Sequence, residues 1–454
     1  MRVFRSWWWL LVSSTVLIGG CSGLLRSPLL SRGAASREEQ SAVATAVAAT
    51  LQALPTVNSG GSGAAGAPQP TVAPSSPTSP PAPQPTAAPP SSTSPPAPQP
   101  TAAPPSASWA RGVWVGDEAS HSADLYHLPG TNLGSVANLP SNASLDADLL
   151  RPVGPDNSVT WVYTDFTPRI LLFPAPGGPA QVYASLPAGP GGDAAVVALL
   201  SCPPSSHFAY SYMQYGNNYQ SNSTLVVAEI GQAPRPVLTL DASEGYALHP
   251  LVYEISPQGT PRALWATTRI FGIGNVMVAP TRGLWRVDLA SGQTVEVLAP
   301  SVNGVEHHVL GVAPNGAAYA YWRQDDPGHV HIAFFGHARP TITLNTTTSV
   351  VGPDSIGYAA FSADGRYVAW VEYSGSFDAG YQGHMTLYDL TSGQPMAVNN
   401  PLPASYQVYP EAWVDAHTLL LRGWNGNSAE VILWDFQNPT VPTEWLGTFL
   451  GVRY

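Results

Sequence analysis

Short apolar runs alternate with turn residues along the chain after Ser106. The runs are rich in Val, Ile, Leu, Tyr and Trp, and Gly, Pro, Asn and Asp separate them. This region contains no long stretch with apolar residues at the three- and four-residue spacing of a helix. Runs of this length and composition, bounded by turn formers, are typical of β-strands. The pattern therefore predicts an all-β domain over residues 107–454.

Similar sequence recurs about every 50 residues, a period that indicates a repeat architecture. Segment 312–322 (VAPNGAAYAYW) aligns with 361–371 (FSADGRYVAWV), and 413–421 (WVDAHTLLL) is a third copy. One apolar strand that ends at a tight turn recurs seven times, at residues 125–128, 170–173, 225–230, 284–289, 332–335, 387–390 and 432–436. Units of this length with four short strands are typical of β-propellers. We therefore predict a seven-bladed β-propeller, with six or eight blades as the alternatives.

The ends of this region predict how the ring closes. Only residues 112–115 and 124–128 form strands before the next turn, so the first unit lacks its innermost strand. The C-terminal segment 445–452 (WLGTFLGV) is apolar. We expect it to complete the first blade, because a closed ring exposes no unpaired strand edge between its ends.

Segment 361–370 (FSADGRYVAW) resembles the WD-repeat-like motif of TolB-type propellers, in which a Ser-x-Asp-Gly turn joins the first strand of a blade to the second. The resemblance extends over residues 300–436 and is weaker in the earlier units, where 154–157 and 256–259 depart from the motif. It implies a rigid interaction scaffold that has no catalytic activity of its own.

The loops that follow the second strand of each unit are long and varied, whereas the other turns are tight. Irregular loops on a rigid frame often carry function, so we predict a binding face there for a protein or glycan partner. Aromatic rings offer flat apolar faces and amides offer paired donors and acceptors. The candidate ligand-binding residues are Tyr215, Asn217, Asn218, Tyr219, Trp322, Tyr373, Phe377, Tyr381, Trp424 and Asn425.

An extracytoplasmic propeller enzyme that acts on glycans or peptides is the alternative. It would gather carboxylates such as Asp325, Asp326 or Asp378 over the channel mouth, and a pair about 5 to 9.5 Å apart would favour it. Asp288, Asp389 and Asp435 recur at one place in the repeat, which indicates a turn-capping role. No catalytic residue is assigned.

Histidines occur in two short groups, His307 with His308 and His329 with His331. Alternate residues of a strand share a face, as a metal site requires, but no spacing fixes a third ligand. We therefore predict no metal and no cofactor.

The charge and motif content of the chain argue against other classes of function. The 454-residue chain has a formal net charge of −11, with 18 basic and 29 acidic side chains, and it contains no lysine. Proteins that bind nucleic acid carry basic patches, so nucleic acid is not a predicted partner. No Gly-x-Ser-x-Gly nucleophile motif occurs either.

The N-terminus predicts export and a lipid anchor. Arg2 and Arg5 precede an apolar run at residues 7–19, which is too short to span a bilayer and fits a signal peptide over residues 1–20. The run ends in LIGGCS, which resembles the lipobox of bacterial lipoproteins. The resemblance implies that Cys21 is lipidated and holds the protein at the extracytoplasmic face of a cell membrane. Cys202 then remains as a small buried residue without a disulfide partner.

Two further segments connect the anchor to the propeller. Residues 21–66 contain a short predicted helix after a capping-box sequence at 36–39, followed by a Gly/Ser/Ala linker. Residues 67–106 repeat Ala-Pro-Gln-Pro-Thr, which excludes helix and predicts a disordered stalk in the polyproline II conformation. The stalk serves as a spacer, with recognition by Pro-x-x-Pro-binding modules as the alternative.

Overall fold

The computed structural model describes residues 109–453 except 141–142, 147, 155–158, 166, 175–177, 217–220, 243, 257–258, 272–277, 338, 349, 351, 377–379, 403–406 and 426. The predicted signal peptide, Cys21, the helix, the linker and the proline-rich stalk lie outside the described residues. Within the described ranges, no helix is long and apolar enough to cross a membrane.

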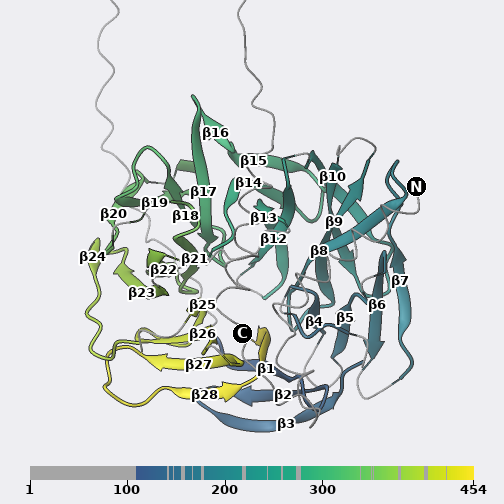
Figure 1. Ribbon diagram of the computed structural model, residues 1–454, viewed down its shortest axis with the longest axis horizontal. Helices are drawn as coiled ribbons and strands as arrows, with labels where there is room; N and C mark the ends of the chain where they lie inside the picture. Colours follow the sequence, from purple (N-terminus) through teal and green to yellow (C-terminus); the bar gives the residue numbers. More distant parts are fainter. Residues whose placement is uncertain are drawn as a thin grey trace, which may run out of the picture. The chain divides into compact units, whose positions relative to one another are not determined.

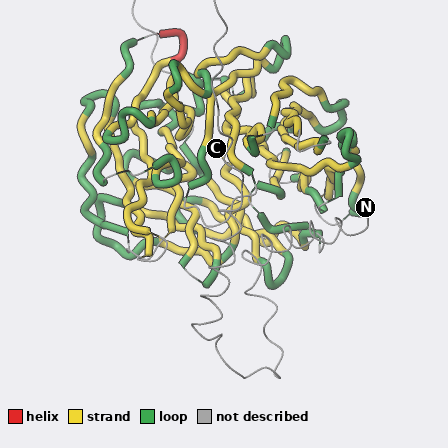
Figure 2. The backbone as a smooth tube through the Cα atoms, turned by 45° about the horizontal axis from the view of Figure 1, so that its top comes forward, coloured by secondary structure: helices red, strands yellow, loops and turns green. Residues whose placement is uncertain are grey.

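Seven antiparallel sheets follow one another around a common centre (Figure 1). Each sheet has four strands, except the fifth, which carries one additional short strand. Figure 2 shows the described backbone as strands and loops, with a short 3₁₀ turn, η3 (Phe335–His337), in blade 5. The predicted all-β fold and the seven-blade count are confirmed.

From the inner to the outer strand, blade 1 contains β29 (Thr448–Arg453), β1 (Gly112–Asp117), β2 (Ser122–His127) and β3 (Thr131–Asn138). Blade 2 contains β4 (Leu150–Val153), β5 (Thr160–Tyr163), β6 (Arg169–Pro174) and β7 (Gln181–Ser185). Blade 3 contains β8 (Asp193–Ser201), β9 (His207–Tyr215), β10 (Ser221–Glu229) and β11 (Arg235–Asp241). Blade 4 contains β12 (Tyr246–Ile255), β13 (Pro261–Ile270), β14 (Thr281–Asp288) and β15 (Thr294–Leu298).

Blade 5 contains β17 (Val305–Val312), β18 (Ala318–Arg323), β19 (His329–Phe334) and β20 (Ile342–Asn345), with β16 (Ser301–Val302) paired to β17. The last two blades contain β21 (Ile356–Phe361), β22 (Tyr367–Ser376), β23 (Gly380–Asp389) and β24 (Gln394–Pro395); and β25 (Gln407–Trp413), β26 (Thr418–Trp424), β27 (Ala429–Asp435) and β28 (Thr443–Leu446). The seven strands predicted from the repeated turn correspond to the third strands, β2, β6, β10, β14, β19, β23 and β27.

The ring closes through the C-terminal strand as the sequence predicts, except that Trp445 and Leu446 of the predicted segment belong to β28, the outer strand of blade 7. The C-terminal strand β29 pairs antiparallel with β1, with Val452 opposite Val113 and Phe449 opposite Val115. Blade 1 therefore takes its inner strand from the end of the chain and its other three strands from the beginning of the domain. This pairing satisfies the backbone groups of β1 that would otherwise form an open edge.

Seven apolar clusters, one between each pair of neighbouring blades, make up most of the core, and two smaller clusters lie around Val278 and Met213. Five of the second strands place a fully buried tryptophan in these clusters, namely Trp114, Trp161, Trp265, Trp322 and Trp370. Neighbouring blades cover both faces of the inner strands, which accounts for their nearly continuous apolar sequence. The outer strand β11, by contrast, contains no buried residue.

The tight turns are built by short polar side chains. In the Ser-x-Asp-Gly turn, Ser362 Oγ donates to Asp364 at 2.6 Å and accepts from the Tyr367 amide at 2.8 Å, while Gly365 takes a φ of 70°. Asp288, Asp389 and Asp435 each accept backbone amides two or three residues later, which confirms their predicted capping role.

Candidate functional site

The strand order gives the ring two different ends. All inner strands begin, and all second strands finish, at the same end, which we call the mouth face. The loops between second and third strands also lie on this face, so it is the face that the sequence analysis selected for binding. Charged and aromatic side chains gather there around the central axis. This axial cluster consists of Asp146, Asp148, Arg151, His249, Arg269, Tyr358, Tyr409, Glu411 and Arg422.

Contacts within the axial cluster join blades that are not neighbours. Arg269 of blade 4 donates to Asp148, which precedes β4 of blade 2, at 3.1 Å. Its second terminal nitrogen donates to the Tyr358 hydroxyl of blade 6 at 3.0 Å. Blade 4 has blades 3 and 5 beside it in the ring, so both contacts must cross the central channel. Arg269 is therefore at the centre of the site.

The other two arginines complete the network. Arg422 pairs with Glu411 at 2.8 Å, and its guanidinium lies 5.5 Å from the Tyr358 ring centre and 5.2 Å from that of Tyr409. The two tyrosine rings lie 4.4 Å apart. Arg151 donates to the carbonyls of Leu199 and Leu450 and thereby joins blades 1, 2 and 3. All seven blades except blade 5 thus contribute to one continuous polar layer.

Water reaches these charges although protein surrounds them. The exposed fraction of the side chain is 24% for Arg269, 26% for Asp148 and 25% for Arg422. Groups in such a channel interact more strongly than groups on an open surface, because fewer waters screen them. The geometry therefore presents preorganised charges to anything that enters the mouth.

Burial and neighbouring charges shift the pKa values of the titratable groups in the axial cluster in different directions. Burial would raise the pKa of Asp148, but Arg269, assisted by the other nearby cations, holds it below its usual value. The pKa of Asp146 is raised by the surrounding protein and by the charge of Asp148, and burial raises that of Glu411 against the effect of Arg422. Burial lowers the pKa of His249 to about 4, so this imidazole is neutral at physiological pH.

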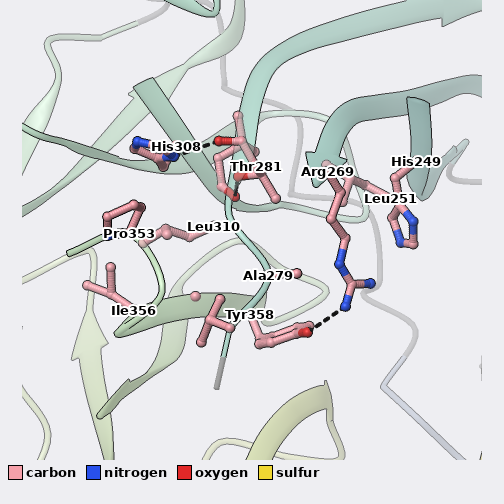
Figure 3. A pocket seen from close by; sticks show the side chains of 13 residues that line it. His249, Leu251, Arg269, Ala279, Thr281, His308, Leu310, Pro353, Ile356 and Tyr358 are labelled. Atoms are coloured by element: carbon pink, nitrogen blue, oxygen red, sulfur yellow. Dashed lines mark hydrogen bonds between the residues drawn. The ribbon is translucent and has the colours of Figure 1, made fainter. Parts of the chain in front are cut away.

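A cavity of about 50 Å³ opens beside Arg269, between blades 4, 5 and 6 (Figure 3). Arg269, His249 and Tyr358 line one side of it. The opposite wall is apolar and includes Leu310, Pro353 and Ile356. His308 also lines the cavity and contacts the Thr281 carbonyl through Nδ1 at 2.7 Å. Because a carbonyl oxygen only accepts, the proton of this contact lies on Nδ1.

The backbone at the site is held in an uncommon conformation. Tyr358 has a φ of 52°, in the left-handed region that bulky residues rarely adopt, and it lies at a register shift between β21 and β22. The preceding Gly357 packs so closely on Val278 that a Cβ would lie 2.3 Å from Val278 Cγ1. Val278 belongs to the loop between β13 and β14, so blade 4 fixes the chain of blade 6. Strain of this kind persists where the surrounding structure imposes it and is common at functional sites.

Two of the predicted ligand-binding residues, Trp322 and Tyr373, are buried. Trp322 and Tyr373 are 1% exposed: the Trp322 indole donates to the Pro327 carbonyl at 3.1 Å, and the Tyr373 hydroxyl bonds the backbone of Val408. Both therefore belong to the core and present no ring face at the surface. This is a correction to their assignment as loop residues, since their strands extend further than expected.

The remaining predicted residues lie at the mouth face or outside the described part. Tyr215 and Trp424 end β9 and β26 and are half-buried. Asn425 shapes its own loop by accepting the amides of Asn427 and Ser428, each at 3.0 Å. Tyr381 lies on β23. Asn217, Asn218, Tyr219 and Phe377 lie outside the described residues, so a ligand site on these loops stays a prediction.

The carboxylates named for the alternative enzyme do not lie on inner strands. Asp325 and Asp326 follow β18, on the loop between the second and third strands of blade 5. Asp325 pairs with Arg323 at 2.8 Å, and Asp326 contacts His329 at 2.5 Å and His331 at 3.2 Å. Asp378 lies outside the described residues. Among the residues that the structure describes, no group of three or more His, Cys, Asp or Glu side chains is arranged to hold a metal ion.

The sequence analysis missed the axial cluster. His249, His308, Tyr358 and Tyr409 occupy the third or fourth position of the inner strand in four consecutive blades. Aligning the inner strands of the repeats, rather than the turns, would have brought these residues to one position. The two arginines that meet them, Arg269 and Arg422, lie near the ends of second strands.

Comparisons with known proteins give fold-level likeness. No family model and no curated protein matches the sequence. Solved structures that resemble it include a puromycin hydrolase (15% identity, TM-score 0.49, 77% of this chain and 53% of that chain), an oligogalacturonate lyase from Vibrio parahaemolyticus (9%, 0.42, 76% and 92%) and Sqt1 from Saccharomyces cerevisiae (12%, 0.41, 74% and 83%). The chain spans about half the length of the puromycin hydrolase. At these identities and TM-scores, the matches carry no information about the activity of this chain.

Proposed function

We propose that this protein is a lipid-anchored binding module at the extracytoplasmic face of a cell membrane. In this proposal Cys21 carries the lipid, residues 67–106 act as a spacer, and the propeller binds an envelope protein or glycan on its mouth face. The TolB-type resemblance of residues 361–370 supports an interaction role. The observation that carries the proposal is the axial cluster, in which Arg269 joins blades 2, 4 and 6 beside an open cavity.

Preorganisation favours binding. Ionic groups that are already fixed by partners lose little conformational entropy when a ligand arrives. Arg269 is held by Asp148 and Tyr358, and Arg422 is held by Glu411 and two aromatic rings. The closed ring and its seven apolar clusters keep these groups in place. A rigid charged mouth of this kind selects partners by complementary charge.

The alternative is an enzyme that acts on glycans or peptides, and one observation favours it. The pKa values of Asp146 and Glu411 are both raised, and a carboxyl group with a raised pKa is suited to general acid catalysis. In this alternative the two carboxyls would donate or accept protons at the mouth. They replace Asp325, Asp326 and Asp378 as its candidate groups.

A capture experiment with the full-length protein in detergent separates the two functions. The wild type, Arg269→Gln and Arg111→Gln are each incubated with solubilised envelope, and bound proteins and glycans are identified. Arg111 is exposed and precedes β1, at the opposite end of the ring from the mouth face, so its variant matches the change in charge. We expect partners that the wild type and Arg111→Gln retain and Arg269→Gln loses.

Identical partner lists for all three proteins would refute a mouth-face binding site. Turnover of envelope peptides or glycans that is abolished in Asp146→Asn with Glu411→Gln would instead establish the enzyme.

For the anchor, metabolic labelling with a fatty acid should mark the wild type and not Cys21→Ala. A labelled Cys21→Ala protein would contradict lipidation at this residue.

A further inference from the structure

The geometry points to a carboxylate on a short apolar arm as the group that enters the axial cavity, supplied by an Asp or Glu side chain of a partner polypeptide. This inference rests on the proposed binding function and specifies the chemistry of its ligand. It depends on three features of the site, which are the donors of Arg269, the apolar wall and the size of the cavity.

Arg269 has N–H donors that form no hydrogen bond with a described residue. A guanidinium carries five N–H groups in a planar fork that suits carboxylates. Two of them are used, by Asp148 and by the Tyr358 hydroxyl, and the remaining three have no partner among the described residues. The side chain keeps 24% of its surface exposed and lines the cavity, so an incoming oxygen can reach it. In Figure 3 its guanidinium extends across the view towards Tyr358.

The wall opposite Arg269 requires an apolar group. Leu310, Pro353 and Ile356 form this wall and present only hydrocarbon (Figure 3). A free inorganic anion would leave this wall without a partner, whereas burial against it stabilises methylene groups. The ligand is therefore a carboxylate attached to carbon, and its arm lies against Leu310 and Ile356.

The size of the cavity limits the arm. A volume of about 50 Å³ holds roughly three or four water molecules. A carboxylate with one or two methylene groups, as in the side chains of Asp and Glu, has about the same size. In a uronic acid the carboxylate is bonded directly to the sugar ring, so the ring would have to enter as well. The cavity thus favours a peptide carboxylate over an acidic glycan.

The charge balance of the axial cluster is compatible with an added anion. Arg151, Arg269 and Arg422 supply three positive charges, and Asp148 and Glu411 are the carboxylates paired with arginines. Asp146 is the third carboxylate in the cluster and interacts with Arg422 and Arg151. A bound carboxylate beside Arg269 therefore meets a cluster that carries no excess negative charge.

The test measures binding of small probes to the full-length protein in detergent. Butyrate, butyramide and trigalacturonate are titrated against the wild type by ligand-observed NMR. We expect butyrate to bind with a millimolar Kd, as suits so few atoms, and butyramide to bind at least about tenfold more weakly. Equal binding of butyrate and butyramide would overturn the inference, and this comparison requires no variant. Tighter binding of trigalacturonate than of butyrate would also overturn it in favour of a glycan.

Variants locate the probe. Arg269→Gln should weaken butyrate binding about tenfold, Tyr358→Phe about twofold, and Arg111→Gln not at all. Thermal melting checks that each variant is folded. Butyrate binding that is unchanged in a folded Arg269→Gln protein would place the probe elsewhere and refute this site. If butyrate fails to bind but envelope capture still depends on Arg269, this inference fails and the proposed function stands. If both fail, the binding function is refuted as well.

Discussion

The interfaces between blades and the axial cluster are built on opposite principles. Each interface is apolar and repeats the same arrangement, with tryptophans such as Trp161 and Trp370 fully buried. The axial cluster is polar, and its side chains come from only four blades: Asp146, Asp148 and Arg151 from blade 2, His249 and Arg269 from blade 4, Tyr358 from blade 6, and Tyr409, Glu411 and Arg422 from blade 7. The difference shows that the repeat supplies the frame, whereas the departures from the repeat supply the chemistry.

Side-chain substitutions should also have different effects in the two regions. At an interface, removing a side chain leaves a void between two sheets and reduces the free energy of unfolding. At the axis, water already reaches the side chains, so changes there should affect charge and binding more than packing. The predictions below test this contrast, beginning with the largest expected effect.

Trp370→Ala should cause the largest loss of stability. The ring is 0% exposed, stacks on Tyr388 at 5.4 Å and donates to Glu372 at 2.8 Å. Its removal should lower the free energy of unfolding by about 3–5 kcal/mol. Urea unfolding followed by tryptophan fluorescence measures the change. The matched control Trp424→Ala, at a half-buried position of β26, should cost about 1 kcal/mol, and an equal loss in both variants would contradict the contrast.

Glu411→Gln should cause an intermediate loss. It leaves Arg422 with two tyrosine rings but without its counter-charge, in a channel that screens charge poorly. We expect a loss of about 1–3 kcal/mol, below that of a fully buried pair because the Glu411 side chain is 20% exposed. The double variant Glu411→Gln, Arg422→Met should recover part of it. Additive losses in urea unfolding would mean that the pair does not interact.

The sequence allowed the frame to be predicted because the frame repeats. The period, the third strands, the Ser-x-Asp-Gly turn and the closing strand β29 all follow from local patterns of apolar and turn residues. The axial cluster could not be predicted in the same way. Arg269 and Asp148 are 121 positions apart, the first on β13 and the second in the turn before β4, so no local pattern connects them. Only closure of the ring brings them together.

The predicted loop residues show the same limit. The mouth face, where the long loops were predicted, also carries the axial cluster, but the composition of the loops did not distinguish rings in the core from rings on loops. Trp322 and Tyr373 lie at the ends of second strands, where the chain still packs between blades. Their burial depends on the neighbouring blade, which the sequence of a single loop does not contain.

His249 should make stability depend on pH. Its folded pKa of about 4 lies below the unfolded value of 6.5, so the unfolded chain takes up a proton first as the pH falls. The protein should therefore lose about 1–2 kcal/mol between pH 6.5 and 4 through this residue, less than the full shift implies because the channel is wet. Asp146 and Glu411, with raised pKa values, act in the opposite direction. The difference between wild type and His249→Asn in urea unfolding isolates the histidine, and parallel pH curves would contradict the prediction.

Asp146→Asn should improve binding of a carboxylate. The change removes one negative charge from the axial cluster while retaining the shape of the side chain, and we expect the Kd for butyrate to fall about threefold at neutral pH. The gain should shrink as the pH falls, because the wild-type carboxyl is then protonated as well. Glu296→Gln, on the exposed outer strand β15, is the matched control and should leave the Kd unchanged. A weaker affinity in Asp146→Asn would mean that this carboxylate helps to hold the ligand.

Counting reactive thiols tests two features, the burial of Cys202 at an interface between blades and the proposed lipidation of Cys21. Cys202 lies in the apolar cluster between blades 3 and 4, is 6% exposed, and burial raises its pKa to about 12. It should therefore not react with a thiol reagent at pH 8 in the native protein, since the thiolate is the reactive form. In the proposed function a lipid occupies Cys21, so under denaturing conditions the membrane-extracted protein should show one thiol, from Cys202. A second thiol would contradict lipidation, a native thiol that reacts at once would contradict burial, and Cys202→Ala should reduce the denatured count to zero.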